Sequence, residues 1–428
     1  NQSINRMANH YRLLIRNASQ LVVIQRSAAR FKRCSEMNEV EIIENGSMII
    51  GDDGNIVAVG TTDELKEIIS DGIFFDELDA TGKTIIPGLC DAHTHAVWSG
   101  DRVEEFAMKL AGATYMDIHK MGGGIGFTVR HTRESTEKEL LELFLKRLEL
   151  MGRNGTTLVE TKSGYGLEFD TELKMLKVIH NATNKSKVDI VSTYLGAHSI
   201  PKDSTVKKAT LDIVENQIPR LQKLKESGEI SPEFIDVFCE KGVFEADDTR
   251  KILQAGKEAG FAINFHGDEL HYTGAAELGA ELDAVAISHL EWVSDKGISA
   301  MAEKDVIAVL LPTTAYILRI EPPPARKLID NGVPVALGSD FNPNAHCLSM
   351  PFVMNLACVT MKMTLNEALN AATINAAASM NRSSTHGSLE VGKCGDFLVL
   401  NAPRWEHLVY QLVNPPIECV YKNGILID

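Results

Sequence analysis

The sequence predicts an α/β fold, a (β/α)8 TIM barrel, with β-rich segments at both ends of the chain. Eight apolar runs of strand length recur through the middle of the chain, and stretches with helical periodicity or helix-capping residues separate them. Strands with near-continuous apolar runs, each followed by a helix, are typical of a parallel sheet covered on its outside. The length of 428 residues suits one such barrel and a small second domain.

The N-terminal segment is predicted to form short strands. Apolar runs at 13–15 and 21–24 come first, and runs at 46–50 and 56–59 then flank the turn Gly51-Asp52-Asp53-Gly54. Glycine and aspartate between two apolar runs are typical of a β-hairpin. We therefore expect this end of the chain to be a β region of its own.

The predicted barrel strands follow in order along the chain. They are residues 84–92, 156–160, 190–196, 234–239, 262–266, 284–289, 306–311 and 334–339. Between the first two, Thr136 and Glu139 have the spacing of a capping box ahead of a periodic apolar stretch, which predicts a helix that stops near Gly152. An open doubly wound sheet is the alternative, but no G-x-G-x-x-G motif follows the first strand.

The C-terminal segment returns to short strands. Runs at 396–400 and 419–421 precede the turn Lys422-Asn423-Gly424 and a last run at 425–427. Both ends of the chain are therefore predicted to be β-rich.

The composition excludes several classes of function. Lys and Arg number 43 against 58 Asp and Glu, a formal net charge of −15, so binding to nucleic acid or to an anionic membrane is not expected. No apolar run approaches the roughly 18–20 residues of a membrane span. The seven cysteines are scattered without a C-x-x-C spacing, so neither a disulfide framework nor a thiolate zinc site is expected. We expect a cytoplasmic protein.

Polar side chains stand at the ends of four predicted strands. His93 and His95 follow the first strand as H-x-H, His266 and His289 end the fifth and sixth, and Asp340 follows the eighth. His93 and His95 point to the same side, because side chains alternate along a strand. The carboxyl ends of barrel strands share one face, where active sites lie. Imidazole and carboxylate ligands without thiolates predict a catalytic zinc or iron site.

This pattern resembles the amidohydrolase superfamily of metal hydrolases, with H-x-H on strand one, His on strands five and six, and Asp on strand eight. The resemblance implies that both chain ends combine into a small β-sandwich, and residues 387–393 with Gly395-Asp396 resemble the usual entry into it. We expect a composite β-sandwich domain of residues 1–86 and 387–428, and a catalytic barrel of residues 87–386.

Further motifs resemble one family of that superfamily, the imidazolonepropionases. These motifs are Asp91 to His95 followed by Arg102, Lys162-Ser163-Gly164-Tyr165-Gly166, Gly196-Ala197-His198, Phe265 to Glu269, Ser288 to Glu291, and Gly338 to Pro343. The resemblance implies hydrolysis of the cyclic amide C–N bond of 4-imidazolone-5-propanoate to N-formimino-L-glutamate, in histidine catabolism.

The resemblance also implies a ligand set and catalytic roles. One zinc or iron ion per chain would be held by His93, His95, His266 and Asp340, and Asp340 would contact the attacking water as well. We expect Glu269 to act as acid and base on the ring nitrogen. His289 is expected to orient the water or to hydrogen-bond the oxyanion, with a role as fifth metal ligand as the alternative.

The substrate implied by the resemblance is a small anion, and its carboxylate needs a cationic partner. Arg102 is the expected clamp, because a guanidinium can bind a carboxylate with two parallel hydrogen bonds. The resemblance adds further substrate contacts and a homodimer. The added contacts are Tyr165, His198, Glu269 and Asn342, with Tyr115 lining the same pocket.

Two features and two rival functions stay open at this stage. Lys241 follows the fourth strand, where relatives with two metals carry a carboxylated lysine. Asn344-Ala345-His346 stands where bacterial relatives often have Gly and then Ser or Thr, so a substrate contact is expected to differ here. The rival functions are a one-metal nucleobase deaminase of the same superfamily and a non-catalytic scaffold.

Overall fold

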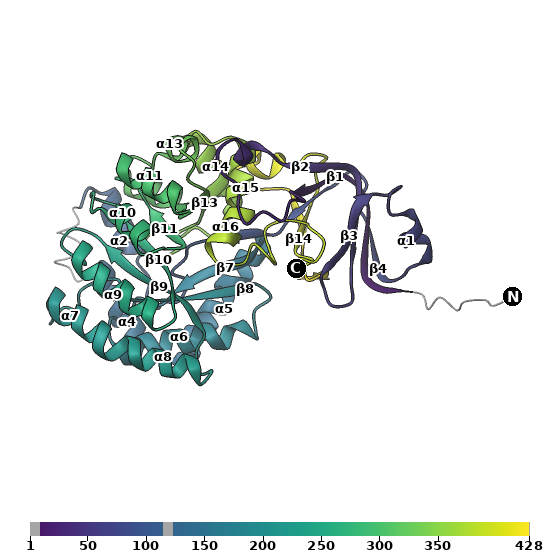
Figure 1. The fold of residues 1–428 in the computed structure, drawn as a ribbon. Helices are drawn as coiled ribbons and strands as arrows, with labels where there is room; N and C mark the ends of the chain where they lie inside the picture. The colour runs from purple at the N-terminus through teal and green to yellow at the C-terminus, as the bar shows by residue number, and fades with distance from the viewer. Residues whose placement is uncertain (1–8, 114–122, 428) are drawn as a thin grey trace.

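The computed structural model describes residues 9–113 and 123–427, which form two sheets with most of the helices gathered around one of them (Figure 1). That sheet contains eight parallel strands in the order β13-β12-β11-β10-β9-β8-β7-β6. They are β6 (Leu89–Asp91), β7 (Thr156–Lys162), β8 (Asp189–Ala197), β9 (Pro232–Cys239), β10 (Ala262–Gly267), β11 (Ala286–His289), β12 (Ile307–Leu310) and β13 (Val335–Leu337). Beyond β6 and β13, Thr94 pairs with Phe341 and closes the barrel. The predicted (β/α)8 barrel is confirmed.

Helices connect successive strands of the barrel. Before β7 lie α2 (Val103–Leu110), α4 (Ile125–Glu134) and α5 (Glu137–Arg153). The others are α6 (Phe169–Thr183), α7 (Val206–Asp212), α8 (Ile218–Glu226), α9 (Ala246–Glu258), α10 (Ala275–Glu281), α11 (Asp295–Glu303), α12 (Pro312–Leu318), α13 (Ala325–Asp330), α14 (Met350–Met361), α15 (Leu365–Ala371) and α16 (Ile374–Ser379). At the start of α5, Thr136 and Glu139 accept hydrogen bonds from each other's backbone amides, so the predicted capping box is confirmed.

The second sheet joins both ends of the chain. Its N-terminal strands are β1 (His10–Ile24), β2 (Glu41–Ile50), β3 (Ile56–Thr61), β4 (Ile73–Asp79) and β5 (Thr84–Pro87); its C-terminal strands are β14 (Phe397–Leu400), β15 (Ile417–Lys422) and β16 (Ile425–Leu426). The short helices α1 (Lys66–Asp71) and α17 (His407–Tyr410) belong to the same two segments. β14 pairs with β5, and β2 pairs with β3 as the predicted hairpin. The two ends therefore combine as expected, while the domain boundaries after residues 86 and 386 stay predictions.

The first strand of the chain differs from its prediction. The runs at 13–15 and 21–24 belong to one strand, β1, which carries a bulge where Asn17 has a φ of +60°. On one side β1 pairs with β2, and on the other it pairs with β4 before the bulge and with β5 after it. A bulge bends a strand and increases its twist. One strand can therefore serve both halves of the mixed sheet.

The run predicted as the first barrel strand also differs. Residues 84–92 divide at Gly88 into β5, in the mixed sheet, and β6, in the barrel. A Cβ at Gly88 would lie 2.1 Å from Thr157 Oγ1, so only glycine fits where the chain crosses between the sheets. An apolar run alone does not show such a crossing, because both halves are equally buried.

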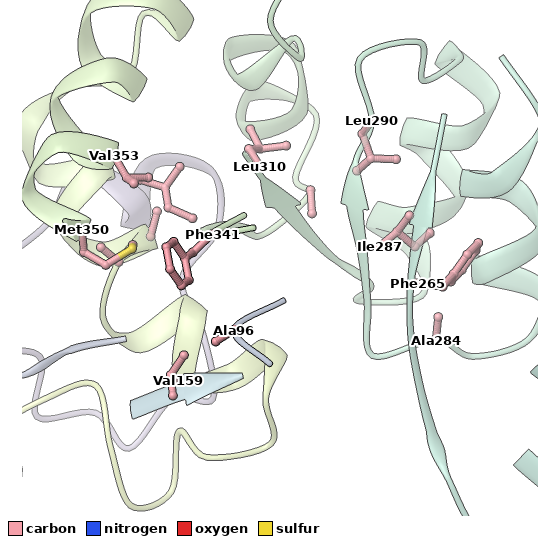
Figure 2. Close-up of a cluster of buried hydrophobic side chains, with 14 of the residues drawn as sticks. Ala96, Val159, Phe265, Ala284, Ile287, Leu290, Leu310, Phe341, Met350 and Val353 are labelled. Atoms are coloured by element: carbon pink, nitrogen blue, oxygen red, sulfur yellow. The ribbon is translucent and has the colours of Figure 1, made fainter. Parts of the chain in front are cut away.

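Side chains alternate along each barrel strand, so that one set packs against the surrounding helices and the other set points into the barrel. Phe265 and Ile287 belong to the buried apolar cluster shown in Figure 2. They face α10, since a Cβ at Gly279 would lie 2.4 Å from Ile287 and 3.0 Å from Phe265. The next residue on each strand, His266 and Ser288, therefore points into the barrel. Packing of the outer face thus fixes which side chains reach the site.

Two expectations about the class of protein can be compared with the structure. Within residues 9–113 and 123–427, no helix combines the length and the apolar character needed to cross a membrane. Within the described part of the chain, Cys34, Cys90, Cys239, Cys347, Cys358 and Cys394 are free thiols, in line with the expectation of no disulfide framework.

Candidate metal centre and active site

Four predicted ligand side chains meet at the carboxyl end of the barrel. His95 Nε2 lies 3.3 Å from His93 Nε2 and 3.2 Å from His266 Nε2. Asp340 Oδ1 lies 3.4 Å from Nε2 of both His93 and His95. All four side chains are buried. The structure thus brings together residues separated by up to 247 positions in the sequence.

The chemistry of these donors fits a metal ion. Burial lowers the pKa values of His93 and His95 well below the usual histidine value, and that of His266 as well, so the three rings are neutral and offer lone pairs. Asp340 Oδ1 is buried, and no residue within 9–113 and 123–427 forms a hydrogen bond with it. Burial raises the pKa of Asp340, but the neighbouring His95 and His289 outweigh this and hold it below its ordinary value. Neutral imidazoles around an unpaired carboxylate oxygen suit a cation such as zinc or iron.

Hydrogen bonds orient three of the four side chains. His93 Nδ1 is bonded to Ser288 Oγ at 2.8 Å, and His266 Nδ1 donates to Asp236 Oδ1 at 2.9 Å. Thr314 Oγ1 donates to Asp340 Oδ2, which leaves Oδ1 directed at the histidines. Such contacts fix the tautomer and the direction of a ligand. The roles of Ser288, Asp236 and Thr314 in orienting the ligands were not predicted from the sequence.

The fourth side chain, His95, is placed differently. Its Nδ1 has no hydrogen-bond partner within the described part of the chain, and its ring stacks on His198 with centroids 4.9 Å apart. His198 Nδ1 donates to the Gly164 carbonyl at 2.9 Å, which fixes the ring. Burial lowers the pKa of His198 to about 4, so this ring too is neutral.

The site contains more donors than one ligand set needs. Three overlapping groups have their donor atoms within 4.8 Å of one another: His93 with His266 and His289, His95 with His198 and His266, and His93 with His95 and Asp340. His289 therefore stays open as a fifth ligand. Lys241 is exposed in the turn after β9 and lines the pocket wall, so the two-metal alternative is left open as well.

Asp91, a buried carboxylate at the end of the first barrel strand, links this strand to the segment that follows the eighth. Asp91 Oδ1 accepts hydrogen bonds from the Ser339 amide at 2.8 Å and from the His93 amide at 3.4 Å. Burial raises the pKa of Asp91 to about 7. Asp340, which follows Ser339, has a φ of +48°. This left-handed conformation is uncommon outside glycine and concentrates at functional sites.

Glu269 and His289 form a pair beside the ligands. Glu269 Oε2 lies 3.5 Å from His289 Nε2, and Glu291 Oε1 lies 3.9 Å from His289 Nδ1. Burial raises the pKa of Glu269 to about 7. Burial disfavours the charged His289 ring, yet the two glutamates outweigh it and raise its pKa to about 10. The Glu291 side chain is buried beside His289 and was missed as a site residue, although it lies two positions after that histidine.

One pocket of about 1030 Å³ contains the predicted substrate contacts. The residues that line it include Arg102, Tyr165, His198, Glu269 and Asn342 together with the ligands His95, His266 and Asp340. Tyr115 lies outside the described residues. The pocket therefore gathers the described residues that were predicted to contact substrate, together with three of the four predicted metal ligands.

The cationic side of the pocket holds an ion-pair cluster. Arg102 donates through Nε and Nη2 to Glu105 Oε2, at 2.9 and 2.5 Å. Lys109 Nζ lies 3.8 Å from the same oxygen and donates to Asn344 Oδ1. Two cations share one carboxylate, so the cluster keeps a net positive charge. Glu105 and Lys109 were missed, although they follow Arg102 at helical spacings of three and seven.

Asn342 is occupied within its own loop. Its Oδ1 accepts from the amides of Asn344 and Ala345 at 2.7 and 3.1 Å, and its Nδ2 donates to the Asp340 carbonyl at 2.6 Å. These bonds shape the turn after the eighth strand. Direct contact with substrate stays a prediction for this residue.

Comparisons with known proteins show the family to which the chain belongs. Residues 84–427 match the amidohydrolase family. Proteins called probable imidazolonepropionase are 61% identical over 422 residues in Dictyostelium discoideum (98% of this chain, 99% of that protein), 59% over 404 in Danio rerio (94% and 93%), and 56% over 423 in Homo sapiens (98% and 99%).

Solved structures share the fold at low identity. A triazine hydrolase variant has a TM-score of 0.70 at 15% identity, covering 97% of this chain and 94% of that one. Guanine deaminase from C. acetobutylicum has a TM-score of 0.67 at 18% identity, covering 97% and 99%. These structures support the fold alone, whereas the sequence relatives identify the family. The chain belongs to the amidohydrolase family and, within it, to the imidazolonepropionases.

Proposed function

We propose that this protein is an imidazolonepropionase, which adds water across the ring amide of 4-imidazolone-5-propanoate and releases N-formimino-L-glutamate in histidine catabolism. The observation that carries the proposal is 56–61% identity over nearly the whole chain with proteins of that name. The nucleobase deaminase alternative is supported only by a shared fold at 16–18% identity.

The proposed ligands of the metal are His93, His95, His266 and Asp340. Their convergence, their neutral rings and the unpaired Asp340 Oδ1 support this set. Zinc or iron held there supplies Lewis acidity, which lowers the pKa of water and polarises an amide carbonyl. Asp340 is proposed to contact the attacking water too, with its second oxygen held by Thr314.

Glu269 is proposed to move the proton that ring opening requires. Cleavage of the amide C–N bond leaves an electron pair on nitrogen, which must receive a proton as the bond breaks. The Glu269 carboxyl lines the pocket, and its pKa, raised by burial, makes it able to bind and release a proton near neutral pH.

His289 is proposed to stabilise negative charge on the substrate oxygen. Its ring is buried between Glu269 and Glu291, which favour the protonated form. A fixed donor in a site without bulk water stabilises a developing oxyanion more strongly than water does. Ligation of the metal by His289 would instead require a neutral ring.

The substrate carboxylate is proposed to bind at Arg102. The cluster of Arg102, Lys109 and Glu105 carries a net positive charge at the pocket wall, although the protein as a whole is acidic. Glu105 holds the guanidinium in place without neutralising both cations. Tyr165 and His198 line the same pocket and are proposed to contact the ring.

We also propose that the chain works as a homodimer in the cytoplasm. Free thiols such as those of Cys90, Cys239 and Cys347 suit a reducing compartment. Val359 on α14 and Tyr410 on α17 are 72% and 78% exposed, and these two helices contact each other, so we propose that a second copy covers these apolar side chains. Light scattering of the purified protein tests the dimer.

The experiment that tests the activity uses metal-replete protein and a panel of substrates. Loss of ring absorbance is followed with freshly made 4-imidazolone-5-propanoate, and ammonia release is followed with guanine, cytosine and adenosine. The proposal predicts ring opening of the imidazolone and no ammonia from the nucleobases and the nucleoside. Ammonia release without ring opening would replace it by a deaminase, and neither activity would favour a scaffold.

A further inference from the structure

A fully buried lysine lies directly behind the proposed metal ligands. Lys162 is the last residue of β7, and its side chain has no solvent exposure. Its Nζ donates to Glu160 Oε1 at 2.7 Å and lies 3.0 Å from Asp236 Oδ2. Both carboxylates are also fully buried. Asp236 orients His266, but neither Lys162 nor Glu160 has a role in the proposed mechanism, although Lys162 begins the motif Lys162-Ser163-Gly164-Tyr165-Gly166.

The Asp236 carboxylate contacts a proposed ligand directly. Asp236 Oδ1 accepts hydrogen bonds from both the backbone amide and Nδ1 of His266, at 3.0 and 2.9 Å. Donation from Nδ1 places the ring proton on that atom and leaves Nε2 with its lone pair toward His95. Asp236 therefore determines both the direction and the tautomer of His266.

The Glu160 carboxylate contacts the H-x-H segment, residues 93–95. Glu160 Oε2 accepts from the amide of Thr94, the residue between His93 and His95, at 3.2 Å. The Lys162 ammonium thus lies between one carboxylate that binds the ligand His266 and another that binds the backbone between the ligands His93 and His95. Glu160 lies on β7 and reaches the segment after β6, whereas Asp236 lies on β9 and reaches His266 on β10.

A cluster of this kind is costly as a stabilising device. Three buried charges lose their hydration, and a buried ion network often contributes no more than well-packed apolar residues would. In the barrel interior, apolar side chains such as Leu158 and Phe234 fill the layer below. Charges at the ligand end therefore require a reason other than packing.

We propose that Lys162 is a positioning residue for the metal centre, acting through Asp236 on His266 and through Glu160 on the segment between His93 and His95. The inference rests on the proposed metal ligation by His266. Removal of the ammonium leaves Asp236 free to rotate away from Nδ1, so His266 loses its fixed tautomer. Loss of such an outer contact typically weakens metal binding about 10–100-fold.

The test compares zinc affinity and the absorption spectrum of the cobalt-substituted protein in two variants. Glu160→Gln is the baseline, and Lys162→Met/Glu160→Gln removes the ammonium while keeping the net charge of the native cluster. The double variant should bind zinc about 10–100-fold more weakly than the single variant, with an altered cobalt spectrum. Equal affinity and identical spectra in the two variants would overturn the inference.

Lys422→Met is the matched control. Lys422 Nζ also lies between two carboxylates, 2.7 Å from Asp189 Oδ2 and from Asp396 Oδ2, but contacts no proposed ligand. Its removal should lower thermal stability and leave zinc affinity within about twofold, since distant sites act independently. An equal loss of zinc affinity in Lys422→Met would assign the effect to general destabilisation and overturn the inference.

A second variant keeps the inference testable if the double variant fails to fold. Asp236→Asn retains the size of the side chain and weakens its bonds to both His266 and Lys162. It should reduce zinc affinity and alter the cobalt spectrum in the same way, and unchanged values would overturn the inference. Wild-type protein that binds no zinc or cobalt would instead overturn the proposed metal site itself, and this inference with it.

Discussion

Glu269 Oε2 lies 3.5 Å from His289 Nε2 at the base of the pocket, and both side chains are buried. A carboxyl group and an imidazole at this separation can share or exchange a proton as the substrate ring opens. His289 shares a donor group with His93 and His266, whereas Glu269 belongs to none of the donor groups among the described residues, so substitution of Glu269 tests proton transfer apart from metal binding.

Substitution Glu269→Gln should abolish most of the turnover. The amide cannot carry the proton to the leaving nitrogen, so kcat should fall about 10²–10⁴-fold while metal content stays that of the wild type. Steady-state kinetics and metal analysis of the same sample measure both. Glu281→Gln, at an exposed glutamate paired with Arg250, is the control and should leave kcat unchanged. Loss of metal in Glu269→Gln would contradict the assigned role.

Substitution Arg102→Ala should act mainly on substrate binding. A hydrogen bond to a charged group contributes about 1.5–3 kcal/mol, so KM should rise about ten- to a hundredfold, with a smaller change in kcat. Arg250→Ala is the matched control, because Arg250 forms a similar pair with Glu281 and neither residue lines the pocket. If kcat fell and KM stayed the same, Arg102 would not be the carboxylate clamp.

Substitution Thr314→Val should weaken the metal centre without touching a ligand. The Thr314 hydroxyl donates to Asp340 Oδ2, and its loss lets the carboxylate rotate. Competition with a chelator should show metal affinity about tenfold lower or more. Thr313→Val is the control, because the Thr313 hydroxyl donates instead to the Ser339 carbonyl. Equal affinities in the two variants would show that Thr314 does not orient Asp340.

Asp189 should contribute stability that depends on pH. Burial raises its pKa, but the hydrogen bond from His386 and the charge of Lys422 outweigh this and hold the pKa at about 2, below the ordinary 3.8. The unfolded chain therefore binds more protons between these values, so the contribution is complete above pH 3.8 and is lost as the pH falls through 2.

The expected size of this contribution is modest. The full shift would correspond to about 2.4 kcal/mol, and since the Asp189 side chain is 48% exposed, solvent screening reduces it to about 1 kcal/mol. Denaturant unfolding of metal-free wild type and Asp189→Asn should differ by that amount from pH 7 to pH 5, and by clearly less at pH 3. A difference that grows as the pH falls would contradict the assignment.

The sequence was sufficient to predict the barrel and the convergence of its polar strand ends. Local patterns carry that information, since apolar runs mark strands and H-x-H places two rings on one side. It was not sufficient to divide residues 84–92 at Gly88 or to join the two runs of β1. Those features depend on which strand lies alongside, and Gly88 is required only because Thr157 approaches it.

The residues that orient the ligands were missed for the same reason. Asp236, Ser288 and Thr314 come from three other strands or helices, and nothing in their own segments marks them as partners of His266, His93 and Asp340. Lys109 and Glu105 had a local signal, because they lie at helical spacing from Arg102. Asn342 was predicted from its motif to contact substrate, and in the structure its side-chain amide forms hydrogen bonds within its own loop.

The most direct test of the account is the rate at which the purified protein opens the ring of 4-imidazolone-5-propanoate before chelation, after chelation and after addition of zinc or iron. The account predicts rapid formation of N-formimino-L-glutamate, loss of activity on metal removal, and recovery as about one ion per chain is restored. Absence of ring opening in protein that carries its metal would contradict it.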